Sequence, residues 1–262
     1  MATILKKKKG HSIKIPTGTK EWADSNVNIC SGCKNNCRYC YAKKMAIRFG
    51  RKTEANWKDM ELNHKLIKKK YSKRSGRIMF PSSHDITSEI LDASMIVLEK
   101  LLFAENEILI TSKPEFVCIR RICDAFLPFQ NKVQFRFTIG SMNNKTLKFW
   151  EPNAPIFEER LKSMKYAFDK GYKTSVSIEP FLDFDPVPLV KILDPHITES
   201  IWIGKMNYIA RNGLTKQEEK HYEEVRKNYT MENILNIYIE LKDHPKIQWK
   251  DSVKKMLNLY SK

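Results

Sequence analysis

Short apolar runs alternate with longer amphipathic stretches along most of the chain. Runs rich in Val, Ile, Phe and Thr are typical of buried strands and occur at six places. These predicted strands cover residues 26–29, 77–83, 107–112, 133–140, 174–180 and 200–204. Stretches with apolar residues at helical spacing follow most of them. Successive β–α units of this kind predict parallel strands joined by right-handed crossovers.

Helical signals lie between and after these strands. The stretch 88–103 opens with Ser88 and places apolar residues at helical spacing. Two further stretches begin with proline, which is favoured in a first helical turn, and one of them ends at Gly171, a natural helix terminus. The predicted helices cover 41–50, 54–71, 88–103, 114–126, 155–170 and 215–242, and an edge strand and a final helix are expected within 246–260.

The number of β–α units sets the predicted fold class. An eight-unit barrel takes about 250 residues, close to the 262 of this chain, but only six strands are convincing. We therefore predict an α/β fold, a partial (β/α)6 TIM-type barrel over residues 26–205. A basic N-terminal extension (1–25) precedes it, and a C-terminal helical closing segment (206–262) of the same domain follows it.

Positive charge is concentrated near the N-terminus. Of the net charge of +17, residues 1–77 carry almost all, with 21 Lys and Arg against 5 Asp and Glu, whereas the rest has 26 against 25. An AT-rich genome favours lysine along the whole chain and does not explain this difference. Basic segments attract polyanions through phosphate contacts and counterion release. We predict a nucleic-acid partner for residues 1–77; the alternative is a surface that only aids solubility.

Apolar runs in the sequence are too short for a bilayer, which takes roughly 20 residues. The N-terminal stretch has no apolar core typical of an export signal. We therefore expect a cytoplasmic protein with no membrane partner. Disulfides are disfavoured in the cytoplasm, so clustered cysteines there are more often ligands or catalytic groups.

Four of the six cysteines lie close together, at positions 30, 33, 37 and 40. A zinc ribbon separates its two ligand pairs by about a dozen or more residues, and here only three residues intervene. Bacterial ferredoxins use a different spacing and follow the last cysteine with proline, whereas Tyr41 follows Cys40. Both alternatives fit poorly, although spacing alone rarely excludes a metal.

The inner triad Cys33-x3-Cys37-x2-Cys40 resembles the CxxxCxxC motif of radical S-adenosylmethionine (SAM) enzymes. The longer string GCKNNCRYCYA resembles the loop of the spore photoproduct lyase group and its phage-associated relatives. Three further stretches are similar to that group: RIMFPSSHDITSEI, ILITSKP and WEPNAPIFEERLKSMKYAFDKGYKTSVSIEPFLD. The resemblance covers about residues 26–205.

The resemblance implies one [4Fe–4S] cluster, held by Cys33, Cys37 and Cys40, with one iron left open for SAM. Reductive cleavage of SAM then yields a 5′-deoxyadenosyl radical that abstracts hydrogen. Such an enzyme takes its electron from a donor such as flavodoxin or ferredoxin. Together with the basic segment, this predicts modification or repair of a nucleic-acid base or modified nucleotide. The alternatives are the same chemistry on a small molecule or peptide, and a metal-binding nucleic-acid module without enzymatic activity.

The resemblance also implies which residues contact SAM. Tyr39 is expected near the adenine, Ser82 or Ser83 at the amino group, and Lys113 at the carboxylate. The remaining expected SAM contacts are Thr138 and Glu179, the latter at the ribose or the substrate. A Glu among apolar residues is costly to bury unless it is paired, which also singles out Glu179.

Three residues are expected to act on the substrate: Tyr41, His84 and Asp85. Tyrosines at the positions of Tyr39 and Tyr41 help to relay a radical in photoproduct lyases; the alternative is that either ring only packs the loop. His84 and Asp85 follow the second strand and are expected to face the substrate; a capping Asp is the alternative. Photoproduct lyases carry a hydrogen-returning cysteine there, and Ser82–Ser83 replaces it here, so another donor is required, such as Tyr41 or a re-formed 5′-deoxyadenosine.

The other cysteines are expected to be structural. Cys30 lies outside the ligand pattern, either as a core residue or as a thiol that exchanges onto the cluster. Cys118 and Cys123 lie on one predicted helix, and thiols are among the most buried side chains. Asp183, Lys205 and Asn207 are weaker candidates for the rim of the site.

Overall fold

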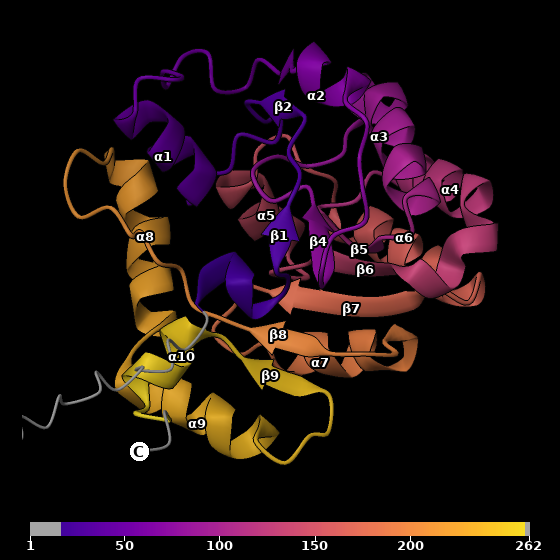
Figure 1. Ribbon diagram of the computed structural model, residues 1–262. Helices are drawn as coiled ribbons and strands as arrows, with labels where there is room; N and C mark the ends of the chain where they lie inside the picture. Colours follow the sequence, from indigo (N-terminus) through magenta and orange to yellow (C-terminus); the bar gives the residue numbers. More distant parts are fainter. Residues whose placement is uncertain (1–16, 260–262) are drawn as a thin grey trace, which may run out of the picture.

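A parallel sheet dominates the computed structural model of the protein, which describes residues 17–259. Seven strands pair in one order, every pair parallel. They are β1 (Ser25–Asn26), β4 (Arg77–Phe80), β5 (Glu107–Ser112), β6 (Val133–Thr138), β7 (Lys173–Ile178), β8 (Ile201–Ile203) and β9 (Ile247–Trp249). Within residues 17–259, β1 and β9 are the free edges, so the barrel is open, as predicted (Figure 1).

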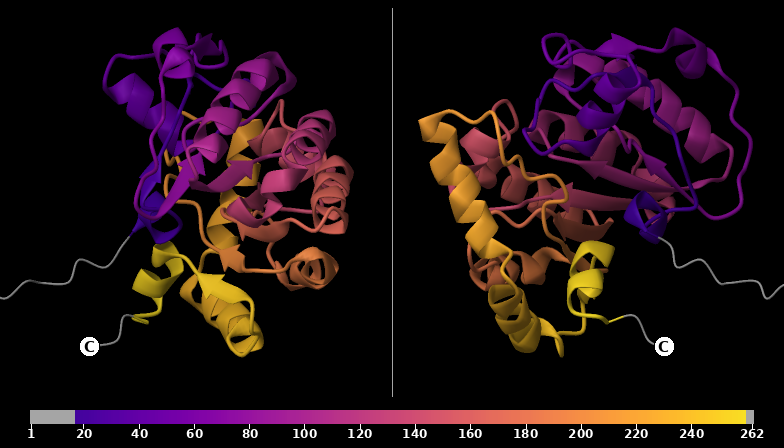
Figure 2. Two further views of the ribbon diagram at one scale, coloured as in Figure 1. Left: turned by 45° about the vertical axis from the view of Figure 1, so that its right-hand side comes forward. Right: turned by 90° about the vertical axis from the view of Figure 1, so that its left-hand side faces the viewer.

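Helices pack around this sheet (Figures 1 and 2). They are α1 (Tyr41–Arg48), α2 (His64–Lys68), α3 (Leu91–Phe103), α4 (Phe116–Ala125), α5 (Asn144–Trp150), α6 (Phe157–Asp169), α7 (Val187–Leu193), α8 (Lys216–Asn228), α9 (Met231–Leu241) and α10 (Asp251–Met256). Short 3-10 helices are η1 (Gly18–Glu21), η2 (Ser88–Ile90), η3 (Leu127–Lys132) and η4 (Asp194–His196). A small antiparallel pair joins β2 (Cys30–Ser31) to β3 (Glu61–Leu62). No helix in the described residues is both long and apolar enough to cross a membrane.

The predicted helix over 54–71 is wrong. Only α2 forms there, and the preceding residues make turns and the strand β3. The Thr53 amide donates to Asn56 Oδ1 at 2.7 Å, and the Asn56 amide donates to the Thr53 hydroxyl at 3.3 Å. Side chains that bond the backbone locally compete with helix formation in this way. Asn63 then caps α2 by accepting from the Leu66 amide at 3.1 Å.

Other boundaries also differ from the prediction. The stretch 215–242 forms two helices, because Thr230 accepts from the Asn233 amide at 3.3 Å and caps α9. The predicted first strand is shorter, since only β1 pairs within 25–29. The prediction missed α5 and α7, whereas β9 and α10 confirm the edge strand and final helix expected in 246–260. The domain boundaries at 25 and 205 stay predictions.

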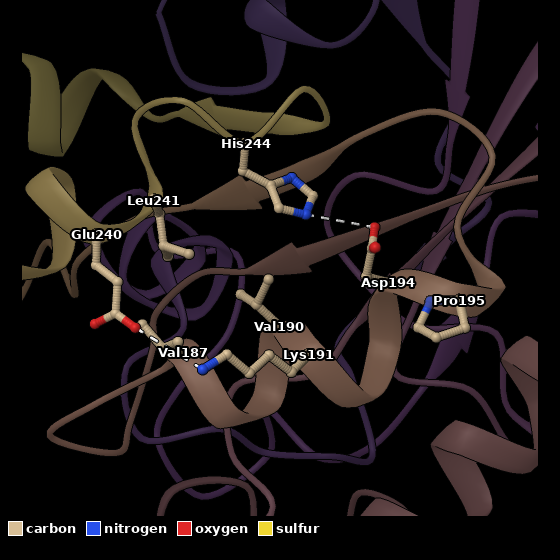
Figure 3. A pocket seen from close by; sticks show the side chains of 8 residues that line it. All are labelled: Val187, Val190, Lys191, Asp194, Pro195, Glu240, Leu241 and His244. Atoms are coloured by element: carbon tan, nitrogen blue, oxygen red, sulfur yellow. Dashed lines mark ion pairs between the residues drawn. The ribbon is translucent and has the colours of Figure 1, made fainter.

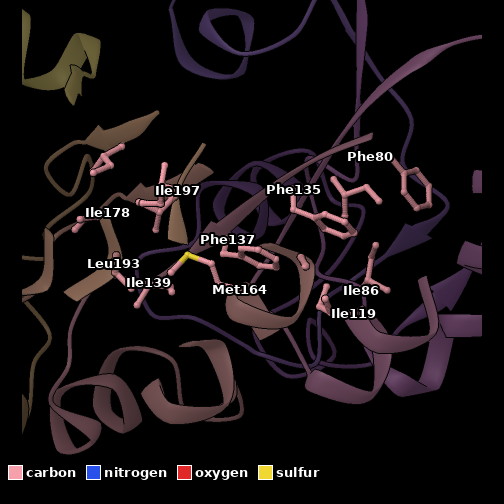
Figure 4. Close-up of a cluster of buried hydrophobic side chains, with 14 of the residues drawn as sticks. Phe80, Ile86, Ile119, Phe135, Phe137, Ile139, Met164, Ile178, Leu193 and Ile197 are labelled. Carbon is pink, nitrogen blue, oxygen red and sulfur yellow. The ribbon is translucent and has the colours of Figure 1, made fainter. Parts of the chain in front are cut away.

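The main core lies between the sheet and its outer helices. Alternate residues of β6 face outward, and the rings of Phe135 and Phe137 stack with centroids 5.5 Å apart. Met164 of α6 and Ile119 of α4 belong to the same buried cluster (Figure 4). Burial of this apolar surface is the main force that holds helices and sheet together.

The inner face of the sheet is polar. The Arg136 Nε donates to the Ser175 hydroxyl at 3.1 Å, and Arg77 Nη1 donates to Gln134 Oε1 at 2.7 Å. The Arg136 guanidinium also lies 4.7 Å from the ring of Trp22, which follows η1. The interior of the open barrel therefore holds hydrogen-bonded polar side chains and aromatic rings, and the carboxyl ends of the strands carry the candidate site.

Candidate functional site

The cysteine loop runs from β2 to the start of α1. Gly32 has a φ of +95° and lies against the carbonyl groups of Trp57 and Asp59, where a Cβ would overlap both. The Cys33 amide donates to the Trp57 carbonyl at 2.9 Å, and the Cys40 amide donates to the Cys37 carbonyl at 3.2 Å. These bonds fold the loop so that Cys33 and Cys37 are buried and Cys40 is partly buried.

Cys40 is the N-cap residue of α1. Its Sγ accepts from the Lys43 amide at 3.4 Å, so the thiol takes the N-cap position. The partial positive charge of a helix N-terminus favours a thiolate there. Burial nevertheless raises the pKa of Cys33, Cys37 and Cys40, and negative charge on neighbouring thiols contributes to the rise for Cys33 and Cys37. The three thiols therefore lie within electrostatic range of one another.

This donor set fits an iron–sulfur cluster. Buried thiols with raised pKa values stay protonated unless a cation binds them, and iron deprotonates the thiols that ligate it. Within residues 17–259, no three His, Cys, Asp or Glu side chains are close enough to hold a single metal ion. In an iron–sulfur cluster each thiolate ligates a different iron, so a cluster suits thiols that are spaced more widely than the ligands of a single ion.

Asp85 links the cysteine loop to β5. Its Oδ2 accepts from Asn35 Nδ2 at 2.8 Å, and its Oδ1 accepts from the Lys113 amide at 2.7 Å. Cys33 Sγ lies 3.7 Å from the same carboxylate. Burial raises the pKa of Asp85, but the Lys113 ammonium and the hydrogen bonds outweigh burial, so the pKa is lowered. The side chain is an ionised anchor and not a helix cap, because Thr87 precedes η2.

Lys113 points toward the thiols. Its Nζ lies 3.7 Å from Asp85 Oδ2 and 5.8 Å from the centre of the Tyr39 ring, and its side chain is 12% exposed. Burial lowers the pKa of Lys113, but the negative charge of Asp85 outweighs this and contributes most to raising it. The ammonium thus offsets negative charge on the thiolates. Its expected contact with the SAM carboxylate stays a prediction.

The Tyr39 hydroxyl is held by a buried ion pair. The hydroxyl donates to Glu151, which forms an ion pair with Arg160; both charged side chains are fully buried. Arg160 Nη1 also donates to the Thr138 carbonyl at 3.2 Å, at the end of β6. One buried chain of contacts therefore joins two residues that were expected to contact SAM.

Ser82 and Ser83 follow β4 at the rim. Their amides donate to Asn28 Oδ1 at 2.7 and 3.0 Å, and Asn28 Nδ2 donates to the Ser82 hydroxyl at 2.9 Å. Asn28 therefore engages the Ser82 hydroxyl, and the expected contact of Ser82 or Ser83 with the SAM amino group stays a prediction. Tyr41 donates its hydroxyl to the Ser82 carbonyl.

His84 is buried behind this rim. Its Nε2 accepts from the Ile29 amide at 3.3 Å, so Nδ1 carries the proton and donates to the Asp85 carbonyl at 3.1 Å. Burial lowers the pKa of His84 and keeps the ring neutral. Both ring nitrogens are used in holding the backbone, a position that suits a structural role; the catalytic role stays a prediction.

Glu179 occupies the rim after β7. Its Oε2 lies 3.8 Å from Lys250 Nζ, and Lys250 also pairs with Glu21 and donates to the Gly18 carbonyl at 2.8 Å. Burial raises the pKa of Glu179 to about 7, although Lys250 opposes the rise. Gly204 follows β8, and a Cβ at this position would clash with the Glu179 side chain. Glycine therefore leaves room for the Glu179 carboxyl beside the end of β8.

The weaker candidates take separate positions. Asp183 accepts from the Ser141 hydroxyl at 2.6 Å, and the Lys205 amide donates to the Ser252 hydroxyl at 3.2 Å. Asn207 is exposed. Cys30 lies in β2, and Cys118 and Cys123 are buried on α4 as predicted.

Four residues of the site were missed: Asn28, Asn35, Glu151 and Arg160. The sequence offered a signal for three of them. Asn35 lies between two cysteines of the motif, and Glu151 and Arg160 belong to the string WEPNAPIFEERL. Asn28 precedes the motif and offered no signal of its own.

A separate pocket lies between α7 and α9 (Figure 3). Its volume is about 310 Å³, and Val187, Val190 and Leu241 line it together with the ion pairs Asp194–His244 and Lys191–Glu240. It contains no cysteine and none of the residues joined through Asp85. The cysteine loop is therefore the better candidate for the reacting site.

Two curated proteins are similar to this chain. An uncharacterised protein ORF301 of Acidianus two-tailed virus is 25% identical over 171 residues, which are 61% of this chain and 55% of that protein. An uncharacterised protein MJ0683 of Methanocaldococcus jannaschii is 28% identical over 159 residues, 60% of each chain. The chain thus spans less than two thirds of the length of these relatives.

Solved structures share the fold. A spore photoproduct lyase mutant with a dinucleoside spore photoproduct aligns with 86% of this chain and 75% of its own, at a TM-score of 0.52 and 14% identity. SuiB of Streptococcus suis, bound to S-adenosylmethionine, aligns with 91% of this chain and 53% of its own, at a TM-score of 0.55 and 11% identity. Similarity at this level of identity establishes the fold alone.

The family comparison identifies the superfamily of this chain. The model of the Radical SAM superfamily matches residues 27–184, which is more than half of the chain. This range includes the three cysteines, Asp85 and Lys113. The chain belongs to the radical SAM superfamily.

Proposed function

We propose that this radical SAM enzyme acts on a base or modified nucleotide within a nucleic acid, and that Cys33, Cys37 and Cys40 hold one [4Fe–4S] cluster. Members of the superfamily are enzymes that use SAM with an iron–sulfur cluster, which argues against a metal-binding module without activity. When bound, these cofactors supply reductive cleavage of SAM and hydrogen abstraction from the substrate.

The residues of the chain position and shield these cofactors. Burial of Cys33 and Cys37 limits the access of water to these thiols. Asp85 fixes the loop, and the Lys113 ammonium offsets the negative charge of ligating thiolates. The SAM contacts that we propose are Tyr39, Ser82, Ser83, Lys113, Thr138 and Glu179. Hydrogen return is assigned to Tyr41, because its hydroxyl reaches the backbone of Ser82, where photoproduct lyases carry their cysteine.

The main support for a nucleic-acid substrate is the distribution of charge along the chain. Residues 1–77 have a net charge of +16, and the cysteine loop lies within them. Nucleic acids bind such segments by releasing counterions, which makes binding steeply dependent on salt. Lys6–Lys9 lie outside the described residues, and Lys68–Lys70 end α2 or follow it, where they are exposed. The same chemistry on a small molecule or peptide is the alternative.

The test uses anaerobically purified protein with its cluster. We expect a brown protein that releases 5′-deoxyadenosine when it is reduced, by dithionite or by a flavodoxin or ferredoxin, in the presence of SAM. Binding of labelled oligonucleotides should weaken steeply as salt increases. Replacing Lys68–Lys70 with glutamine should reduce that slope. A protein that is active on SAM but binds no oligonucleotide would overturn the substrate class and favour a small molecule or peptide.

A further inference from the structure

A row of exposed rings and apolar side chains runs along α1 from the cysteine loop. Tyr41, Met45 and Phe49 are spaced by four residues, so they follow one side of the helix. Their exposed fractions are 46%, 36% and 60%. Tyr208, on the segment between β8 and α8, is 48% exposed and lies beside the same helix, since Lys44 Nζ is 4.7 Å from the centre of its ring.

Cations alternate with these rings. Lys44, Arg48 and Arg51 are exposed, and none of them forms an ion pair with another residue in 17–259. The guanidinium groups of Arg48 and Arg51 each lie 5.8 Å from the centre of the Phe49 ring. Lys43, by contrast, turns to the other side and pairs with Glu54 at 2.5 Å. These side chains form a strip in which unpaired positive charge lies next to exposed rings. Its members are Tyr41, Lys44, Met45, Arg48, Phe49, Arg51 and Tyr208.

The strip leads directly to the site. Tyr41 follows Cys40 and donates its hydroxyl to the Ser82 carbonyl at the end of β4. The other end of the strip, at Phe49, lies at the end of α1, on the side of the molecule where α8 also lies (Figures 1 and 2). A linear ligand that follows the strip reaches the rim beside the cysteine loop.

We propose that this strip binds single-stranded nucleic acid and guides one base to the radical site; its members are Tyr41, Lys44, Met45, Arg48, Phe49, Arg51 and Tyr208. The inference rests on the proposed function and specifies the state of its substrate. Single-strand binding sites combine cations that follow the backbone with rings on which bases stack. A base inside a duplex is out of reach for chemistry, so enzymes that act on a base take it out of the stack or use a single strand.

The experiment measures the affinity of the anaerobic holoenzyme for two probes by fluorescence anisotropy. One probe is a labelled oligothymidylate, and the other is an abasic phosphodiester strand of the same length. Phe49→Ala and Tyr208→Ala should each weaken oligothymidylate binding about tenfold and leave abasic binding unchanged. Lys44→Gln with Arg48→Gln should weaken both probes and reduce the salt slope. Retained abasic binding also shows that the ring variants are folded.

Matched controls lie away from the strip. Phe103→Ala removes a ring that is 66% exposed on α3, and Lys173→Gln removes an exposed lysine at the opposite end of the strands. Both should bind each probe as the unchanged protein does. If the ring variants bind oligothymidylate as tightly as the controls, the strip is not the binding surface, although nucleic acid remains the substrate class. If the unchanged protein binds neither probe, the proposed function itself fails.

An acidic electron-donor protein is the competing occupant of a basic strip. If Lys44→Gln with Arg48→Gln weakens binding of a flavodoxin but not of oligothymidylate, the proposal is overturned in favour of that donor. If a duplex of the same length binds more tightly than the single strand, the single-strand specification is wrong.

Discussion

Asn35 Nδ2 donates a hydrogen bond of 2.8 Å to Asp85 Oδ2, and this contact fastens the cysteine loop to the segment after β4. Asp85 is 8% exposed and is also the counter-ion of Lys113. The cysteine loop is therefore held by a carboxylate that lies 50 residues away in sequence.

Asp85→Ala should destabilise the protein and release iron. It leaves the buried Lys113 ammonium unpaired and removes the acceptor of Asn35, and breaking a buried ion pair costs about 3–5 kcal/mol. The measurements are the free energy of unfolding in urea and the iron content per chain. Asp92→Ala, which breaks an exposed pair with Arg121, should cost less than about 1 kcal/mol. Equal effects of the two substitutions would contradict the anchoring role.

Gly32→Ala should prevent the loop from reaching its ligand geometry. The φ of +95° is strained for alanine, and the added Cβ would lie 2.8 Å from the Trp57 carbonyl oxygen. Backbone must move to relieve the overlap, so we expect loss of cluster absorbance and iron. Gly50→Ala is the matched control: φ is +64° and no atom lies within 4 Å, so only strain of about 1–3 kcal/mol arises. Full iron content in Gly32→Ala would show that the loop tolerates a shift.

Cys30→Ala should retain the cluster, whereas Cys37→Ala should lose it. The Cys30 side chain lies in β2, where its Sγ is 3.6 Å from the Ser31 carbonyl and 3.8 Å from the Gly32 carbonyl. Burial raises its pKa to about 11. Iron analysis and release of 5′-deoxyadenosine distinguish the two variants. Comparable iron loss from both would place Cys30 among the ligands or identify it as an exchanging thiol.

The sequence was most informative where a local pattern determines the structure. The run 107–112 matches β5 at both ends, because a buried strand needs a continuous apolar stretch. The spacing of Cys33, Cys37 and Cys40 pointed to the family that the comparison then confirmed. Both signals lie within a few consecutive residues.

Contacts between distant segments were not predictable. Asn28 orients the amides of Ser82 and Ser83 across 54 and 55 residues, and the sequence around Asn28 does not indicate its partners. Glu151 and Arg160 form a fully buried pair under Tyr39, although charged residues are usually exposed. Such side chains were missed because their role depends on which loops the barrel brings together.

Glu179 should make stability fall as the pH rises from 4.5 to about 7. Burial raises its pKa from its ordinary value of 4.5 to about 7, so in this range the folded protein holds a proton that the unfolded chain has released. The contribution of Glu179 to the free energy of unfolding is then fully present below pH 4.5 and is lost as the pH passes through the folded pKa. Glu179→Gln should remove this slope, measured by urea unfolding across the range. Glu223→Gln, which removes an exposed carboxylate on α8, should keep it. An unchanged slope in Glu179→Gln would mean that Glu179 stays ionised beside Lys250.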